Sequence, residues 1–266
     1  MGQTTPARGR AAFSAALFLS ALGGCASVQS SGADAAICAS DAVRVYADFP
    51  AAGRHDCIIA PDGAIIVTVD HEPSVEDGIN PSPWFALRLE AQTAGRHTLV
   101  LDYPGYDHRY SPETSTDRMS WRALDAAHIV LSEDETRATL TLDLAAGDNW
   151  LAGQPIVSSR EQVEWTRARL APAGFREVEY GRSLQDRPLI GFIGGNLDAP
   201  DVYVALTRQH PPETTGQDAF RGLVARLVDR DDAAIESFVL RHKILLAPMA
   251  NPDGVDGGYW RLNRGG

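Results

Sequence analysis

The second half of the chain takes its predicted fold from the stretch Asp201-Val-Tyr-Val-Ala-Leu-Thr-Arg-Gln-His-Pro-Pro-Glu213. Its apolar run Val202–Leu206 is typical of a strand that is buried on both faces of a sheet. His210 and Glu213 follow at the carboxyl end of this strand, where open α/β sheets place their active sites. Imidazole and carboxylate are both zinc ligands, and residues one helical turn apart can reach the same ion. The stretch therefore predicts a strand that delivers a metal-binding pair.

Helices and strands alternate on either side of this stretch. The second predicted helix shows the amphipathic period most clearly, because its apolar side chains recur every three or four residues between 220 and 228. We therefore expect an α/β domain over residues 153–266, with a mixed sheet and flanking helices. The predicted strands are 176–180, 188–193, 202–206 and 243–248, and the predicted helices are 161–170, a segment after 213, and 232–240.

Residues 38–152 show a different pattern, made of short strands separated by turns such as Pro61-Asp-Gly63. Regular short strands without helical periodicity are typical of an antiparallel β-sandwich. We expect such a sandwich to precede the α/β domain. The clearest strand-like runs are 64–69, 84–89, 97–101 and 139–142.

The charge of the chain excludes two classes of partner. Its 266 residues include 24 basic and 35 acidic side chains, and the net charge is −11 at pH 7. A chain this acidic is unsuited to binding nucleic acid, and it is unsuited to electrostatic docking on anionic lipid.

The first 24 residues have the pattern of an export signal. Arg8 and Arg10 precede the apolar run 11–22, which is too short to span a bilayer. Leu22-Gly-Gly-Cys25 resembles a bacterial lipobox, in which the signal is cleaved before the cysteine and Cys25 carries lipid. An ordinary secretory signal is the alternative.

Lipid on Cys25 implies a membrane anchor, because two or more acyl chains hold a protein firmly on a bilayer. Ala26 and Ser27 follow the cysteine, and by the same resemblance they favour the bacterial outer membrane, with the protein facing the periplasm. Residues 25–37 are rich in Ser, Gly and Ala, which predicts a flexible tether.

Cys38 and Cys57 are the remaining cysteines. In an exported chain such a pair favours a disulfide, here closing a loop of about 20 residues and stabilising the fold by about 3 kcal/mol. Two unrelated buried thiols are the alternative.

Taken singly, the polar motifs of the α/β domain have ordinary explanations. His210 and Glu213 also fit a polar turn with a helix N-cap, and Asn251-Pro-Asp-Gly254 fits a type I turn. Arg261 is one arginine among many. Their order is more informative, because a strand, His-x-x-Glu, two helices, a strand, Asn-Pro-Asp-Gly and an arginine in an aromatic-flanked loop follow one another.

This order resembles the zinc metallocarboxypeptidase family, and within it the subgroup similar to cytosolic carboxypeptidases, in which a β-sandwich precedes the catalytic domain. Segments Trp84–Arg88 and Tyr180–Ser183 add to the resemblance, which covers nearly all of residues 40–266. It implies a zinc-dependent peptidase that removes C-terminal residues from peptides or proteins. It also implies that His210 and Glu213 are zinc ligands and that Arg261 binds substrate and polarises the scissile carbonyl.

The resemblance further implies residues that this sequence does not contain. A third zinc ligand, a general-base Glu and an Asp-Leu-Asn-Arg-like motif, whose Asn-Arg pair grips the terminal carboxylate, are all expected after Arg261, and we expect the sequence as given to stop before them. Two protein ligands make an incomplete catalytic zinc site. We interpret the other histidines as structural or surface residues, namely His55, His71, His97, His108, His128 and His242.

Two hypotheses from different classes follow. The first is an exported, lipid-anchored zinc carboxypeptidase-like protein whose sequence here is partial. The second is a non-catalytic lipoprotein, in which the sandwich binds peptide or glycan and the α/β part is structural.

Overall fold

The computed structural model describes residues 35–70, 82–229 and 231–263. The predicted signal, the predicted lipid site at Cys25, most of the tether and His71 lie outside these residues. No helix within these ranges has the length and apolar character needed to cross a membrane. The described residues belong to one compact unit, so the predicted boundary near residue 152 stays a prediction.

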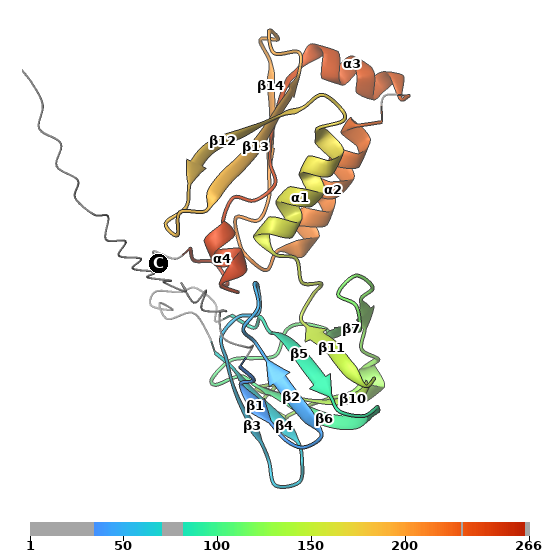
Figure 1. Cartoon of the computed structure of the whole chain (residues 1–266), viewed down its shortest axis with the longest axis vertical. Helices are drawn as coiled ribbons and strands as arrows, with labels where there is room; N and C mark the ends of the chain where they lie inside the picture. The colour runs from blue at the N-terminus through green and yellow to red at the C-terminus, as the bar shows by residue number, and fades with distance from the viewer. Residues whose placement is uncertain (1–34, 71–81, 230, 264–266) are drawn as a thin grey trace, which may run out of the picture. The chain divides into compact units, whose positions relative to one another are not determined.

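Two β-sheets form the first part of the described chain (Figure 1). One has the order β1-β2-β5-β11-β7-β8, and the other has the order β3-β4-β6-β10-β9. In chain order the elements are β1 Cys38–Ala39, β2 Val43–Tyr46, β3 His55–Ile59, β4 Ile65–Val69, β5 Ala86–Ala91, β6 Gly95–Asp102, β7 Glu113–Ser115, β8 Arg122–Ala123, the 3-10 helix η1 Ala126–His128, β9 Ile129–Leu131, β10 Arg137–Leu144 and β11 Gly147–Ala152.

Side-chain alternation along these strands builds a single core between the two sheets. In β4, Ile65, Val67 and Val69 are buried while the residues between them are partly exposed. The predicted sandwich is therefore confirmed, with one difference: β4 pairs with β6 in parallel, Ile65 lying opposite Leu99. The intervening strand β5 lies in the other sheet, so the chain returns to β6 running in its original direction.

A disulfide joins Cys38 in β1 to Cys57 in β3. The two Cα atoms are 5.4 Å apart, within the range that a disulfide spans. Because β1 and β3 belong to different sheets, the bond ties one sheet of the sandwich to the other.

The second part of the described chain is a four-stranded mixed sheet of order β12-β13-β15-β14, with helices on one face (Figure 1). Leu170, Phe220 and Val239, one from each of the three longer helices, share a buried core with Phe192 and Leu246 of the sheet. This confirms the predicted α/β class. The elements are α1 Ser159–Leu170, β12 Arg176–Arg182, β13 Pro188–Gly195, β14 Val202–Leu206, α2 Thr214–Leu227, α3 Ala233–Arg241, β15 Lys243–Ala247 and α4 Pro252–Asp256.

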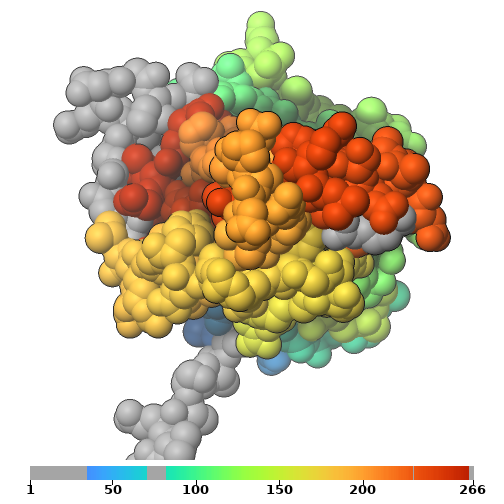
Figure 2. Space-filling view, turned by 90° about the horizontal axis from the view of Figure 1, so that it is seen from above, coloured from blue at the N-terminus to red at the C-terminus, as the bar shows by residue number. Residues whose placement is uncertain are grey.

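The prediction that Val202–Leu206 is buried on both faces is wrong. The strand, β14, lies at the edge of the described sheet and pairs only with β15, in parallel. Tyr203 and Ala205 pack against the helical core, whereas Val202, Val204 and Leu206 face away from it and are about half exposed, with Val204 at 56%. Figure 2 shows the start of β14 (orange) at the surface beside α3 (orange-red).

Candidate functional site

His210 and Glu213 lie side by side in the turn between β14 and α2. The His210 Nδ1 atom is 2.7 Å from Glu213 Oε1, and both side chains are partly exposed. The turn is not the helical turn that the sequence suggested, because helix α2 begins only at Thr214. Glu213 occupies the N-cap position, yet its carboxylate makes no capping hydrogen bond and contacts the imidazole instead. The two predicted ligands are therefore together, with their donor atoms converging.

Arg261 reaches the same place from the end of the described chain. Its Nη1 atom lies 3.1 Å from His210 Nδ1 and 3.3 Å from Nε2, and its guanidinium also lies 5.6 Å from the centroid of the Trp260 ring. The structure thus brings together all three residues that the sequence predicted for this site. The resulting group combines an imidazole, a carboxylate and a guanidinium.

Asn251 holds the two site-bearing loops together. Backbone hydrogen bonds run from Ala250 N to Thr207 O at 3.0 Å and from Asn251 N to Arg208 O at 3.1 Å. The Asn251 amide nitrogen also donates to the carbonyl oxygens of Gln209 and Leu262. Its side-chain oxygen accepts from Gly254 N at 2.9 Å, so Asn251 is the N-cap of α4.

Arg208 is a buried cation close to the pair, and no sequence motif singles it out. Its side chain bonds to Gln217 of α2 and donates to the Val157 carbonyl oxygen at 3.3 Å, while its Nε has no partner among the described residues. Burial lowers the pKa of Arg208 to about 10. Its backbone adopts the left-handed conformation, with φ at 60°. The burial and the positive φ of Arg208 depend on the folded chain, so a local sequence pattern does not predict them.

Two carboxylates fix α4, and with it the loop that carries Arg261. Asp253 accepts from Ser183 Oγ at 2.7 Å, from Gln185 N at 3.0 Å and from Arg187 Nη1 at 2.9 Å. Burial raises the pKa of Asp253, but these three bonds outweigh it and hold the pKa below its usual value. Asp256 accepts from the backbone and hydroxyl of Ser159, at the start of α1, at 2.8 Å and 2.6 Å.

The sandwich contributes directly to the same region. Ala51 N donates to Asp256 O at 3.0 Å. Gly258, with φ at 65°, packs so closely on the sandwich that an added Cβ would lie 2.2 Å from Gly53 N. The ring of Tyr110 lies 6.5 Å from that of Trp260, and burial, with a smaller contribution from Glu213, raises the Tyr110 pKa to about 12. Tyr110 is therefore a sandwich residue near the candidate site.

A cavity of about 450 Å³ opens beside Arg261. Asn251 and Arg261 line one part of it, and Arg182, Leu184 and Leu189 of the β12–β13 hairpin line another. The space is within the size range of small-molecule and peptide side-chain pockets. A ligand in it contacts both the guanidinium and apolar side chains.

The described residues fit a zinc site only in part. His210 Nδ1 and Glu213 Oε1 are zinc donors by type, and their convergence suits one ion. Within residues 35–70, 82–229 and 231–263, however, no group of three or more His, Cys, Asp or Glu side chains is placed to hold a metal.

Three other described histidines make contacts of their own. His55 bonds to the Ala52 carbonyl, His108 to the Tyr103 hydroxyl, and His242 to the Phe238 carbonyl. Their rings are therefore engaged in local structure, as the sequence interpretation expected.

Comparisons with known proteins find a similar family and similar structures. Residues 165–265 match the family model described as zinc carboxypeptidase. A metallo-carboxypeptidase from Burkholderia cenocepacia has a similar structure, with a TM-score of 0.69 and 24% identity, over 85% of this chain and 60% of that one. A metallo-carboxypeptidase from Pseudomonas aeruginosa, solved in complex with (2-guanidinoethylmercapto)succinic acid, gives a TM-score of 0.70 and 21% identity, over 84% of this chain and 59% of that one.

No curated protein matches the chain. The chain spans about 60% of the length of the solved structures it resembles. The described residues therefore have the fold of bacterial metallocarboxypeptidases, and residues 165–265 carry the sequence pattern of the zinc carboxypeptidase family.

Proposed function

We propose that this protein is a zinc-dependent metallocarboxypeptidase-like hydrolase that acts on the C-terminal residues of peptides. The observation that carries the proposal is the position of Arg261, whose guanidinium lies 3.1 Å from the imidazole of the His210–Glu213 pair. In this proposal His210 and Glu213 hold the metal. When bound, zinc supplies a Lewis acid that polarises a carbonyl and activates water.

The residues of the chain would divide the remaining work. A guanidinium fixed beside the metal pair stabilises negative charge as it develops on the carbonyl oxygen, a contribution often worth a few kcal/mol. The Asn251 bonds to Gln209 and Leu262 keep the His210 and Arg261 loops in register, so neither group has to reorganise during reaction. The cavity beside Arg261 would receive the peptide.

A complete catalytic zinc centre holds three protein ligands and a water. The described residues bring two such donors together, His210 and Glu213, in no larger group of metal-binding side chains. We therefore expect residues 1–266 by themselves to bind zinc weakly and to hydrolyse peptides poorly.

Two measurements test the proposal, first zinc binding and then peptide hydrolysis. Zinc affinity is measured by chelator competition on the full chain, and peptide hydrolysis by mass spectrometry of the products. We expect zinc binding that requires both His210 and Glu213. Wild-type affinity in the variants His210→Ala and Glu213→Gln would contradict the metal assignment.

A non-catalytic lipid-anchored binding protein is the second candidate. Under this reading the sandwich binds a peptide or glycan and His210 holds no metal. Stoichiometric zinc that a chelator removes argues against it, whereas metal-free protein that still binds peptide or glycan supports it.

We also propose that the protein is exported and anchored in a bacterial outer membrane through lipid on Cys25, facing the periplasm. The lipobox-like sequence before Cys25 supports this, as does a disulfide between Cys38 and Cys57, since such bonds persist in oxidising compartments. Mass spectrometry of the mature N-terminus tests it, with Cys25→Ser as the unlipidated control. An unmodified Cys25 in the membrane fraction would refute the anchor.

A further inference from the structure

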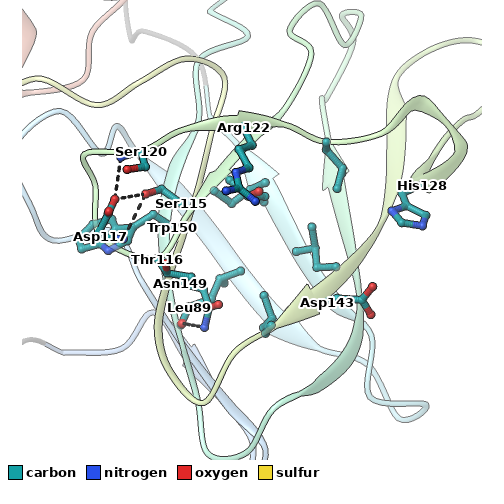
Figure 3. Close-up of a pocket in the computed structure, with 15 residues that line it drawn as sticks. Leu89, Ser115, Thr116, Asp117, Ser120, Arg122, His128, Asp143, Asn149 and Trp150 are labelled. Atoms are coloured by element: carbon teal, nitrogen blue, oxygen red, sulfur yellow. Dashed lines mark hydrogen bonds between the residues drawn. The ribbon is translucent and has the colours of Figure 1, made fainter.

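The sandwich contains a cavity of its own, of about 480 Å³ (Figure 3). It lies near β7 and β8 of one sheet and β10 of the other, beside the segment that leads from β7 to η1. Its lining residues include none of His210, Glu213 and Arg261. The function proposed above therefore leaves it unused.

Both leucine side chains and polar side chains line this cavity. Leu89 and Leu151 line it from one sheet, Leu142 and Leu144 line it from the other, and Leu124 lies on the connecting segment. The first four belong to the buried core of the sandwich. An apolar group that enters the cavity would meet side chains already removed from water, so its burial is favourable.

Most polar groups around the cavity already have partners. Asp117 accepts from the backbone nitrogens of Met119 and Ser120, both at 2.7 Å. Asp143 is paired with Arg96 at 2.8 Å. The Asn149 amide nitrogen bonds to carbonyl oxygens within its own turn. The side chains of Asp117, Asp143 and Asn149 therefore stabilise the residues around the cavity, and a ligand could bind them only by breaking these bonds.

Arg122 differs from these groups. It is exposed on β8, and within the described residues it has no ion-pair partner. Figure 3 shows its side chain directed from its strand into the cavity. His128 also lines the cavity, and the pKa of Asp143 is lowered mainly by its hydrogen bonds with Arg96, with a smaller electrostatic contribution from His128. The cavity thus combines leucine side chains with a guanidinium that no carboxylate of the described chain neutralises.

We propose that this cavity is a binding site for a small carboxylate with an apolar body, such as the C-terminal residue of a peptide. The carboxylate would bind Arg122, since a guanidinium recognises carboxylates with two parallel hydrogen bonds. The apolar body would lie against the leucines. The net charge of −11 disfavours anions at long range, so the attraction for the carboxylate has to come locally from Arg122.

The site is tested by calorimetric titration of the full chain with N-acetyl-L-leucine. We expect the neutral analogue N-acetyl-L-leucinamide and the variant Arg122→Gln each to weaken binding by about tenfold or more, because a charge-assisted hydrogen bond is lost. N-acetylglycine, which lacks the apolar side chain, is expected to bind about tenfold more weakly. Equal binding of the acid and the amide would overturn the proposal.

Two matched variants locate the site. Arg44→Gln removes the same charge from β2 of the same sheet, away from the cavity, and is expected to leave the affinity unchanged. Arg261→Gln is expected to leave the Arg122-dependent part of the binding in place, and complete loss of binding in that variant would place the ligand in the other cavity and overturn the assignment. Octanoate separates two sources of the ligand: tighter binding of N-acetyl-L-leucine supports a peptide C-terminus, and tighter binding of octanoate refutes that source in favour of an acyl chain.

Discussion

The guanidinium of Arg261 lies 3.1 Å from Nδ1 of His210, the same ring nitrogen that contacts the Glu213 carboxylate at 2.7 Å. One nitrogen is therefore the meeting point of a carboxylate and a cation. A metal held by His210 and Glu213 would replace their direct contact. The positive ion and the positive Arg261 guanidinium would then be close neighbours. The arrangement suits a substrate whose carbonyl oxygen lies between them.

The first prediction concerns the metal pair. We expect His210→Ala and Glu213→Gln each to lower zinc affinity by at least about tenfold, since each removes one of two converging donors. Chelator competition measures the affinity. His97→Ala, which changes a histidine of β6 in the sandwich, is the control and is expected to bind zinc as the wild type does.

The second prediction concerns the left-handed backbone of Arg208, with φ at 60°. A side chain with a Cβ is strained there by roughly 1–2 kcal/mol, whereas glycine is not. We expect Arg208→Gly to be more stable than Arg208→Ala by about 1 kcal/mol in urea unfolding, although both lose the bonds to Gln217 and Val157. If the alanine variant were as stable as the glycine variant, the left-handed backbone at residue 208 would not be strained.

The third prediction compares two glycines with positive φ. Gly258→Ala would place a Cβ 2.2 Å from Gly53 N, whereas Gly63→Ala, at φ 87°, meets nothing within 4 Å. We expect the Gly63 variant to lose about 1 kcal/mol from backbone strain alone, and the Gly258 variant to lose at least about 2 kcal/mol more. Thermal unfolding of both variants measures the difference. Equal losses would contradict the prediction, because they would mean that the backbone at Gly53 moves away from the new Cβ at little cost.

The fourth prediction concerns pH. Burial lowers the pKa of His55 from 6.5 to about 4, so the unfolded chain binds a proton at this residue more readily than the folded chain does. The stability from neutral His55 is therefore present above pH 6.5 and is lost as pH falls towards about 4. We expect a slope of up to about 1.4 kcal/mol per pH unit in this window, measured by urea unfolding. The slope should largely disappear in His55→Gln.

The fifth prediction concerns the disulfide. The bond between Cys38 and Cys57 joins residues 19 apart in sequence and ties the two sheets together. We expect Cys38→Ser with Cys57→Ser to cost about 3 kcal/mol in the free energy of unfolding. The reduced wild-type protein should show the same loss, and an unchanged unfolding midpoint in the presence of reductant would refute the contribution.

The sequence predicted a β-sandwich followed by an α/β fold because the spacing of apolar residues differs between residues 38–152 and residues 153–266. It failed for β14, since a continuous apolar run does not show whether a second layer covers the strand. Val202, Val204 and Leu206 have the composition of buried positions, yet about half of each is exposed in the described chain. Burial depends on neighbours that a local pattern does not contain.

The same limit applies to the candidate site. His210 and Glu213 are three residues apart, so their contact follows from local geometry, but Arg261 lies 51 residues from His210 and only the family resemblance brought it to the site. Arg208 carried no signal at all, because its importance lies in its burial and in its backbone angle. The role of Asn251 as a joint between two loops likewise depends on contacts to Gln209 and Leu262 that only the folded chain makes.

The backbone bonds that pin the His210 loop have a consequence for synthesis on the ribosome. Thr207 and Arg208 receive their hydrogen bonds from Ala250 and Asn251, which are translated more than forty residues later. Until those residues leave the ribosome, the loop lacks the partners that hold it, even though β14 and α2 are already made. The sandwich can fold first, as N-terminal domains generally do. The backbone that carries His210 and Glu213 therefore gains these two hydrogen bonds only after Ala250 and Asn251 have been translated.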